Sequence, residues 1–239
     1  KISISYTGNP SQTIEEVSAD DSGNSEELTL NAPPLEYSME PSEEQPYAEY
    51  TIRVQAPGYR DITVSAINVL PGETAIQNVR METEDAPGDR IDTIVIAAHT
   101  LYAEYPPKIP EEEIKPMNES GEIVLSRVVI PEYIVVHDGA PGDTTASDYY
   151  VRYRDYIKNV ASSEIYATWP DAAIRANVLA IMSFTLNRVY TEWYRGKGYN
   201  FTITSSTAYD HKFIYGRNYF QSISRIVDEM FENYLSRPN

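Results

Sequence analysis

One glutamate, Glu164, lies in a stretch whose residue types suit acid–base chemistry. It falls near the end of a predicted helix and is followed by Ile165, Tyr166 and Trp169. Burial disfavours the charged form of a carboxylic acid, so a glutamate among such side chains tends to keep its proton. A carboxyl group that is protonated near neutral pH can donate to a leaving oxygen, as the cleavage of a glycosidic bond requires.

The residues around Glu164 also form a sequence motif. Its positions are Lys158, Val160, Glu164, Trp169, Pro170, Ala172, Ala173 and Ala176. This pattern resembles the stage II sporulation protein D family, whose motif has Lys-x-Val, then Glu-Met, then Trp-Pro and a run rich in alanine. The resemblance covers roughly residues 150–219, and Ile165 stands where the family motif has Met.

The resemblance implies an activity. Family members known as enzymes are lytic transglycosylases of peptidoglycan, and the glutamate of the motif is their catalytic acid, which makes Glu164 the expected catalytic residue. It would protonate the oxygen between N-acetylmuramic acid and N-acetylglucosamine, and the muramic acid 6-hydroxyl would capture the oxocarbenium-like centre. Because this nucleophile belongs to the substrate, no second catalytic carboxylate is needed. The resemblance implies no metal and no organic cofactor.

A second polar cluster lies at 205–217, where several hydroxyl groups, one Asp, one His and two tyrosines occur close together. This composition suits the binding of a sugar. The segment resembles the family's second conserved block, in which Thr residues precede a Gln-hydrophobic-Tyr element, and His211 takes the Gln position. A polar turn before a helix explains the same residues equally well.

These two segments give the expected substrate-binding residues, which are Ser163, Tyr166, Tyr209, Asp210 and His211. We expect Tyr209 and Asp210 to position the substrate. Ser163 or Tyr166 is expected to hydrogen-bond the catalytic carboxyl group.

The elements that carry these residues are predicted to be helices from about Tyr150 onward. Pro170 is typical of a helix start, and Gly196 and Gly198 of a helix end. Apolar residues recur at helical spacing in two stripes: Ile174, Val178, Ile181, Met182, Leu186, Val189 and Trp193, then Phe220, Ile223, Val227, Met230, Phe231 and Tyr234. The pattern predicts a mainly helical domain over 150–239.

Residues 1–84 show the two-residue alternation of strands instead. The predicted strands cover 1–6, 50–55, 61–69 and 75–81, and Pro-Gly pairs separate the later ones. This spacing predicts a small β-sandwich. The segment from Tyr50 to Glu73 is similar to transthyretin-like and carboxypeptidase regulatory-type modules, which implies a spacing or adhesive role.

Residues 85–149 are predicted to connect the two parts. Two runs rich in β-branched residues, 90–98 and 121–130, could pair as a hairpin. Between them, 105–116 contains four prolines and is predicted to be extended. The whole chain is therefore predicted to be an α+β multidomain protein with a β-sandwich, an extended connector and a helical domain.

Charge is unevenly distributed along the 239 residues, whose net charge is −17. Residues 1–149 carry 8 basic and 28 acidic side chains, a net −20, and residues 150–239 carry +3. The acidic part argues against a nucleic-acid partner, and the mildly basic part suits an anionic polymer such as peptidoglycan. No apolar run reaches the length of about 20 residues that a membrane helix needs, and the chain has no Cys.

Two classes of function follow. The first is a peptidoglycan-cleaving lytic transglycosylase fused to a β-sandwich spacer, and the second is a non-catalytic binding or structural protein of the wall or surface. Both imply a place outside the cytoplasm, in the cell wall or at the cell or spore surface. Since Lys1 to Tyr6 already forms a predicted strand, we expect the chain to begin inside a larger protein or after processing. The family's later glycine-rich block is not in the sequence, so either the sequence is a fragment or the site is incomplete.

Overall fold

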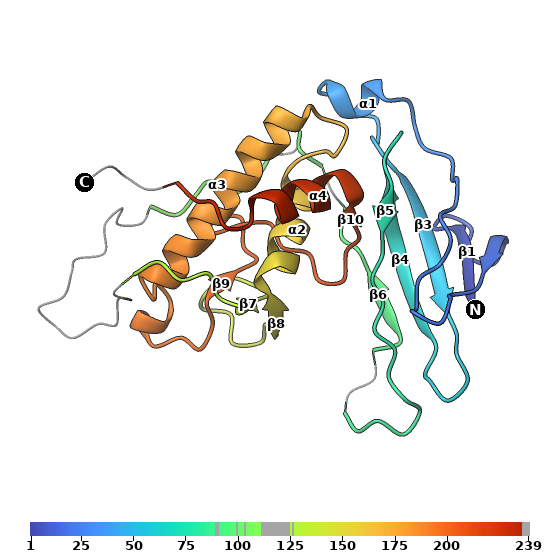
Figure 1. The fold of residues 1–239 in the computed structure, drawn as a ribbon, viewed down its shortest axis with the longest axis horizontal. Coiled ribbons are helices and arrows are strands. Elements are labelled where there is room, and N and C mark those ends of the chain that lie inside the picture. Colours follow the sequence, from blue (N-terminus) through green and yellow to red (C-terminus); the bar gives the residue numbers. More distant parts are fainter. Residues whose placement is uncertain (89–90, 99, 103, 111–124, 126, 236–239) are drawn as a thin grey trace, which may run out of the picture. The chain divides into compact units, whose positions relative to one another are not determined.

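The computed structural model describes residues 1–88, 91–98, 100–102, 104–110, 125 and 127–235 (Figure 1). The chain is a mixed α+β protein, as its sequence predicts. It forms two compact units, which we call the first unit (1–100 and 215–221) and the second unit (101–214 and 222–239). These ranges differ from the predicted parts 1–84, 85–149 and 150–239, because 215–221 belongs with the strands at the beginning of the chain.

The first unit is built on a five-stranded sheet with the strand order β2-β1-β3-β4-β6. The strands are β1 (Ile2–Tyr6), β2 (Thr13–Val17), β3 (Ala48–Val54), β4 (Ile62–Val69) and β6 (Thr93–Val95). All neighbours pair antiparallel except β4 and β6, which are parallel. The strands predicted at 1–6, 50–55 and 61–69 are confirmed, and the sandwich arrangement stays a prediction.

Alternation along the strands explains the core of this sheet. Ile4, Val17 and Tyr50 form one buried cluster, because successive side chains of a strand point to opposite faces. Tyr50 is 1% exposed and donates its hydroxyl hydrogen to the backbone oxygen of Asn31 at 2.7 Å. The buried phenol is thus both packed and hydrogen-bonded, as a buried tyrosine requires.

A one-turn helix, α1 (Glu36–Met39), lies in the part that was predicted to contain only strands. That prediction is wrong at this point. Pro34 fixes the backbone just before the turn, and Glu36 places an acidic side chain in the first turn, where the helix dipole favours it. The hydroxyl group of Ser38 also donates to the backbone oxygen of Leu35 at 2.9 Å.

Residues 215–221 complete the first unit from the far end of the sequence. Strand β10 (Tyr219–Phe220) pairs antiparallel with β5 (Ala75–Ile76). The Asn218 side chain accepts from the backbone N–H of Asn68 at 3.0 Å and donates to its carbonyl oxygen at 2.9 Å. Next to it, Arg217 is 4% exposed and donates to the side-chain oxygen of Asn68 at 3.2 Å. Burial lowers the pKa of Arg217 to about 10.

The second unit contains a three-stranded sheet of order β8-β7-β9. Its strands are β7 (Tyr133–His137), β8 (Asp148–Arg152) and β9 (Ile203–Thr204), with β7 antiparallel to β8 and parallel to β9. Strand β7 lies inside 85–149, the range that was predicted to connect the two parts. Strand β9 and the last three residues of β8 lie inside 150–239, the range that was predicted to be mainly helical.

Three helices pack in this unit: α2 (Tyr153–Glu164), α3 (Asp171–Tyr190) and α4 (Gln221–Met230), with a short 3-10 helix η1 at Arg195–Lys197. The apolar stripe of α3 is buried as predicted at Ile174, Val178, Ile181, Met182 and Leu186. The stripe of α4 is buried at Ile223 and Val227. The helix α3 ends at Tyr190 rather than near Gly196, because Glu192 adopts a left-handed backbone with φ of 47°.

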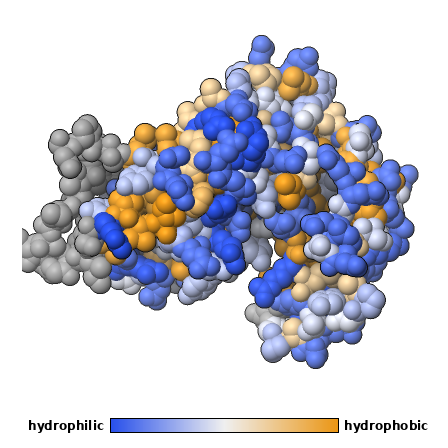
Figure 2. Space-filling model, viewed as in Figure 1, coloured by the Kyte–Doolittle hydropathy of each residue, from blue (hydrophilic) through white to orange (hydrophobic). Residues whose placement is uncertain are grey.

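Ion pairs join α4 to the other helices of the second unit. Arg225 contacts Asp171 of α3 at 2.9 Å, and Asp228 accepts from Lys158 of α2 at 2.9 Å. Hydrophilic residues cover much of the face that Figure 2 shows, and hydrophobic residues gather in smaller patches between them. Among the described residues no helix combines the length and apolar character needed to cross a membrane. The predicted pairing of 90–98 with 121–130 lies largely outside the described residues.

The position of 215–221 gives a test of the first unit. Asn218→Ala should lower the free energy of unfolding, because it leaves two buried backbone groups of Asn68 without partners at about 1–3 kcal/mol each. Urea denaturation measures the change. The matched control is Asn78→Ala, since Asn78 bonds the Tyr219 hydroxyl of the same segment at 2.7 Å but is exposed. Equal losses in the two variants would contradict the role assigned to Asn218.

Candidate functional site

Glu164 is the last residue of α2, as the sequence predicts. The helix ends there because Ile165 turns to an extended backbone, with φ of −147°, while its N–H still bonds the carbonyl oxygen of Ala161. A short turn follows, in which the N–H of Trp169 bonds the carbonyl oxygen of Tyr166 at 3.0 Å. Pro170 then precedes α3. The Glu164 carboxyl group therefore lies at a helix end, on a backbone fixed from both sides.

The Glu164 carboxyl group is half-buried and is held by one backbone donor. Its Oε1 atom accepts the N–H of Lys212 at 2.9 Å. Burial raises the pKa of Glu164 above its ordinary value of 4.5, and the Lys212 N–H and the charges of Lys108 and Lys212 counter part of that rise. The burial effect is the largest, so the group keeps its proton to a higher pH than an exposed glutamate.

Two lysines and a tyrosine surround this carboxyl group. Lys108 donates its ammonium group to the backbone oxygen of Asp210, and the Lys212 ammonium nitrogen lies 5.4 Å from the ring centre of Tyr105. Burial raises the pKa of Tyr105, and the negative charge of Glu164 adds to that rise. The sequence prediction missed all three residues, because Tyr105 and Lys108 lie in the supposed connector. For Lys212 one signal was available in the sequence, because this residue directly follows His211, which was an expected substrate-binding residue.

Ser163 and Tyr166, which were expected to hydrogen-bond Glu164, have contacts elsewhere. Ser163 is 1% exposed and donates its hydroxyl hydrogen to the backbone oxygen of Asn159 at 2.9 Å. The Tyr166 hydroxyl accepts the backbone N–H of Leu101 at 3.2 Å, and its ring is fully buried. Both residues therefore hold the backbone on either side of Glu164.

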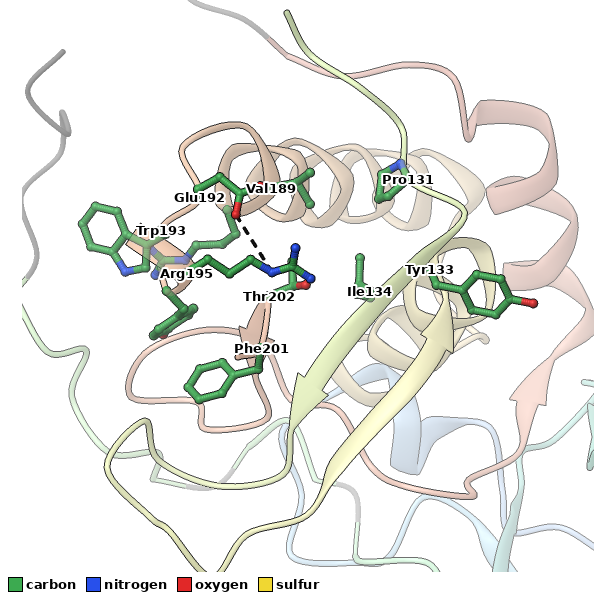
Figure 3. A pocket seen from close by; sticks show the side chains of 11 residues that line it. Pro131, Tyr133, Ile134, Val189, Glu192, Trp193, Arg195, Phe201 and Thr202 are labelled. Carbon is green, nitrogen blue, oxygen red and sulfur yellow. Dashed lines mark ion pairs between the residues drawn. The ribbon is translucent and has the colours of Figure 1, made fainter. Parts of the chain in front are cut away.

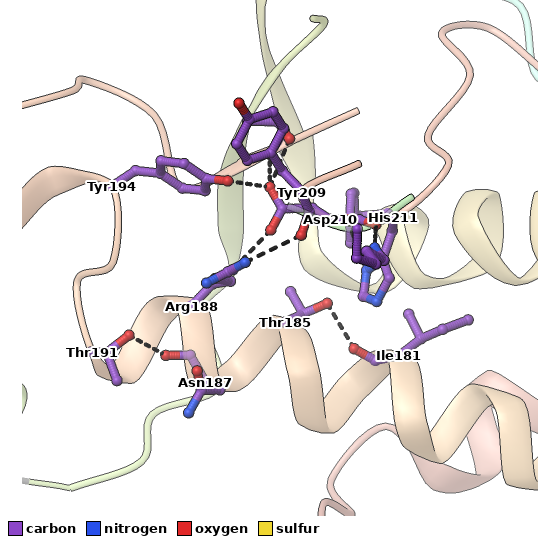
Figure 4. Close-up of polar contacts among 12 residues, drawn as sticks. Ile181, Thr185, Asn187, Arg188, Thr191, Tyr194, Tyr209, Asp210 and His211 are labelled. Atoms are coloured by element: carbon purple, nitrogen blue, oxygen red, sulfur yellow. Dashed lines mark hydrogen bonds and ion pairs between the residues drawn. The ribbon is translucent and has the colours of Figure 1, made fainter. Parts of the chain in front are cut away.

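Asp210 is the centre of a buried polar network (Figure 4). Its Oδ1 atom accepts from the Arg188 side chain at 2.8 Å. Its Oδ2 atom accepts from the Tyr194 hydroxyl at 2.7 Å and from the N–H and hydroxyl of Thr204 at 2.9 and 2.6 Å. Asp210 is 1% exposed, so the structure places it as a support for the loop rather than on an accessible surface.

His211 and Tyr209 flank Asp210 in the same loop. His211 Nδ1 lies 3.2 Å from the hydroxyl oxygen of the buried Tyr156. The His211 ring packs against the Phe184 ring, with 4.7 Å between the two ring centres. Burial lowers the pKa of His211 to about 3, so the ring is neutral near pH 7. Tyr209 is half-buried, and its backbone oxygen accepts from Arg188 at 3.3 Å. The loop thus brings Tyr209, Asp210 and His211 together beside the residue that bonds Glu164.

Comparison with known proteins gave no matching family model, no matching curated protein and no matching solved structure. The resemblance to the sporulation protein D family therefore rests on the motif residues alone. Two pockets formed by described residues, one in each unit, do not include Glu164 in their linings.

The buried network around Asp210 predicts a large stability effect. Asp210→Asn should lower the free energy of unfolding by about 3–5 kcal/mol, because it leaves the buried Arg188 cation without its ionic partner. The control is Asp171→Asn, which removes an exposed partner of Arg225 and should cost about 1 kcal/mol or less. Urea denaturation at pH 7 compares the two. Similar losses would show that the Asp210 pair is no more important than a surface pair.

The raised pKa of Glu164 predicts a pH-dependent difference in stability. Ionisation of Glu164 favours the unfolded chain, because the folded pKa lies above the ordinary value of 4.5. Wild-type protein should therefore lose stability relative to Glu164→Gln as pH rises from about 4.5 through the raised pKa, and the difference should then stay constant. Denaturation at a series of pH values measures it. Glu132→Gln, at an exposed position in the same unit, is the control, and an equal trend in this variant would contradict the role assigned to burial of Glu164.

Proposed function

We propose that this chain is a peptidoglycan-directed cell-wall protein and that Glu164 is the general acid and base of a lytic transglycosylase. The observation that carries the proposal is the state of Glu164. It occupies the motif position of a catalytic acid, is half-buried, and has a pKa that burial raises. A general acid works best when its pKa is close to the working pH, and a raised glutamate pKa moves in that direction.

The proposed reaction uses one carboxyl group twice. Protonated Glu164 donates its proton to the glycosidic oxygen between N-acetylmuramic acid and N-acetylglucosamine as the bond from that oxygen to the muramic acid anomeric carbon breaks. The muramic acid 6-hydroxyl oxygen bonds to the same carbon, and the Glu164 carboxylate takes the hydroxyl proton. The products are a 1,6-anhydromuramic acid end and a free hydroxyl group on the other sugar, and Glu164 is again protonated.

The neighbouring residues have defined parts in this proposal. The N–H of Lys212 fixes one oxygen of Glu164 at 2.9 Å, so the other oxygen is the proposed proton donor. The charges of Lys108 and Lys212 limit the rise of the Glu164 pKa and stabilise the carboxylate formed after proton transfer. Tyr209 is proposed to position the sugar. Asp210 supports the loop that carries both Tyr209 and Lys212.

The first unit is proposed to be the spacer of the pair, as a sandwich of the transthyretin-like or carboxypeptidase regulatory type. Its acidic charge suits a solvated surface that keeps the protein dispersed. The proposed place of the protein is outside the cytoplasm, in a bacterial cell wall or at the cell or spore surface. The proposed partner is the peptidoglycan glycan strand.

A second candidate function is a non-catalytic wall- or surface-associated binding protein. The contacts of Ser163, Tyr166 and Asp210 favour it, because these expected substrate-binding residues contact their own chain. Under this alternative the motif residues stabilise the fold, and the Glu164 carboxyl group has no catalytic role.

Glu164→Gln separates the two candidates. If the protein cleaves glycan strands, this change should reduce the release of anhydro-muropeptides from purified sacculi by about 10²–10⁴-fold, because an amide cannot deliver or take up the proton. Binding to sacculi should be nearly unchanged. Glu132→Gln is the control and should retain activity.

Assays of the wild-type protein for sacculus binding and for product release decide between the two candidate functions. Binding to sacculi without any release of anhydro products would assign the protein to the binding class. Release that continues unchanged in Glu164→Gln would show that another residue is the acid.

A further inference from the structure

The second unit has a small pocket that the proposed reaction does not use (Figure 3). Its volume is about 100 Å³, and it is lined by Pro131, Tyr133, Ile134, Arg188, Val189, Glu192, Trp193, Tyr194, Arg195, Phe201 and Thr202. The Arg195 side chain extends through the pocket toward Glu192, with Ile134 on one side and Trp193 and Phe201 on the other. The pocket thus combines two arginines, one carboxylate and apolar walls, and Arg188 is already ion-paired with Asp210.

Glu192 has an unusual position at the end of α3. The N–H of Trp193 bonds the carbonyl oxygen of Arg188 at 3.2 Å, and the N–H of Glu192 bonds that of Val189 at 3.2 Å. These two bonds form a Schellman motif, in which the residue at the position of Glu192 is usually Gly. Glu192 accepts a φ of 47° there, which an L-residue adopts only at a cost. Glycine would adopt this backbone at a lower cost in free energy, so the helix end alone does not require a glutamate at this position.

The ion pair between Arg195 and Glu192 is weak. Arg195 Nε and Glu192 Oε2 are 3.9 Å apart, and the Arg195 side chain is 53% exposed, whereas that of Glu192 is 17% exposed. At 3.9 Å, with the Arg195 side chain largely in solvent, the pair contributes little to stability, so a ligand can separate it at small cost. The pair therefore offers one group that binds a carboxylate and one that binds an ammonium group.

The aromatic walls argue against a sugar as the occupant. The Trp193 ring has the Lys197 ammonium nitrogen 3.7 Å and the Arg188 guanidinium carbon 4.6 Å from its centre. The Phe201 ring already stacks on His137 at 4.4 Å. Neither ring therefore offers the open face on which a sugar would stack. Trp193 is 6% exposed, and within the described part of the chain its buried Nε1 atom has no hydrogen-bond partner.

We propose that this pocket binds the zwitterionic end of an amino acid, with the carboxylate on Arg195 and the ammonium group on Glu192. Arginine pairs with a carboxylate through two parallel N–H bonds, and such charge-assisted bonds are stronger than neutral ones. Ile134 and Phe201 provide the apolar wall for a short aliphatic side chain. The small volume limits that side chain to a size near that of alanine. The proposal is independent of the chemistry at Glu164.

Binding of alanine to the purified protein, measured by calorimetry or by NMR titration, tests this proposal. Alanine should bind, whereas N-acetylalanine, which has no ammonium group, and alaninamide, which has no carboxylate, should each bind about tenfold or more weakly. Arg195→Gln should weaken alanine binding by a similar factor. Arg225→Gln removes an exposed arginine that is also ion-paired, and it should bind alanine like wild type.

Glu192→Gly adds a test that a folding defect cannot imitate. Glycine favours the left-handed backbone at this position, so the variant should have a higher Tm than wild type. It should nevertheless lose alanine binding by about tenfold or more, because the partner of the ammonium group is gone. A higher Tm with unchanged binding would overturn the proposal. Absence of alanine binding to wild type at about 10 mM, or equal binding of the three compounds, would overturn it as well.

Discussion

The second unit depends on one buried ion pair, that between Arg188 of α3 and Asp210 of the loop after β9. Two buried charges are costly to remove from water, and they persist only when further hydrogen bonds satisfy them. Here Tyr194 and Thr204 supply those bonds. The network fixes the loop two residues before Lys212, and Lys212 presents its N–H to Glu164. The position and the protonation of the candidate acid thus depend on a charge pair that does not contact it.

In the first unit, buried backbone groups are hydrogen-bonded by a neutral side chain. The carboxamide of Asn218 bonds both backbone groups of Asn68, so a strand end that would otherwise be unpaired is satisfied by a side chain from the far end of the sequence. Arg217 is buried beside it and has a lowered pKa, yet it also bonds the side chain of Asn68. These buried hydrogen bonds and the burial of Phe220, which is 0% exposed, both hold 215–221 in this unit.

Local periodicity predicted the parts of the fold that a single element determines. The α3 stripe, the strands β3 and β4, and the place of Glu164 at a helix end all follow from residue spacing. The site around Glu164 could be predicted only in part. Lys212 lies 48 residues from Glu164, and Lys108 lies 102 residues from Asp210, so these contacts depend on tertiary packing that no local pattern encodes.

The discontinuity of the first unit also has a consequence for its synthesis. Asn68 and Asn218 are 150 residues apart, so during translation the strands β1 to β5 leave the ribosome long before their last partner exists. The entropy cost of closing a loop grows only slowly with its length. The long separation therefore delays the pairing of Asn68 with Asn218 more than it weakens that pairing. At about 5–20 residues per second, the early strands wait roughly 8–30 seconds with a polar edge open to solvent. Residues 101–214 have that interval in which to fold, whereas α4 of the second unit is synthesised only after Asn218.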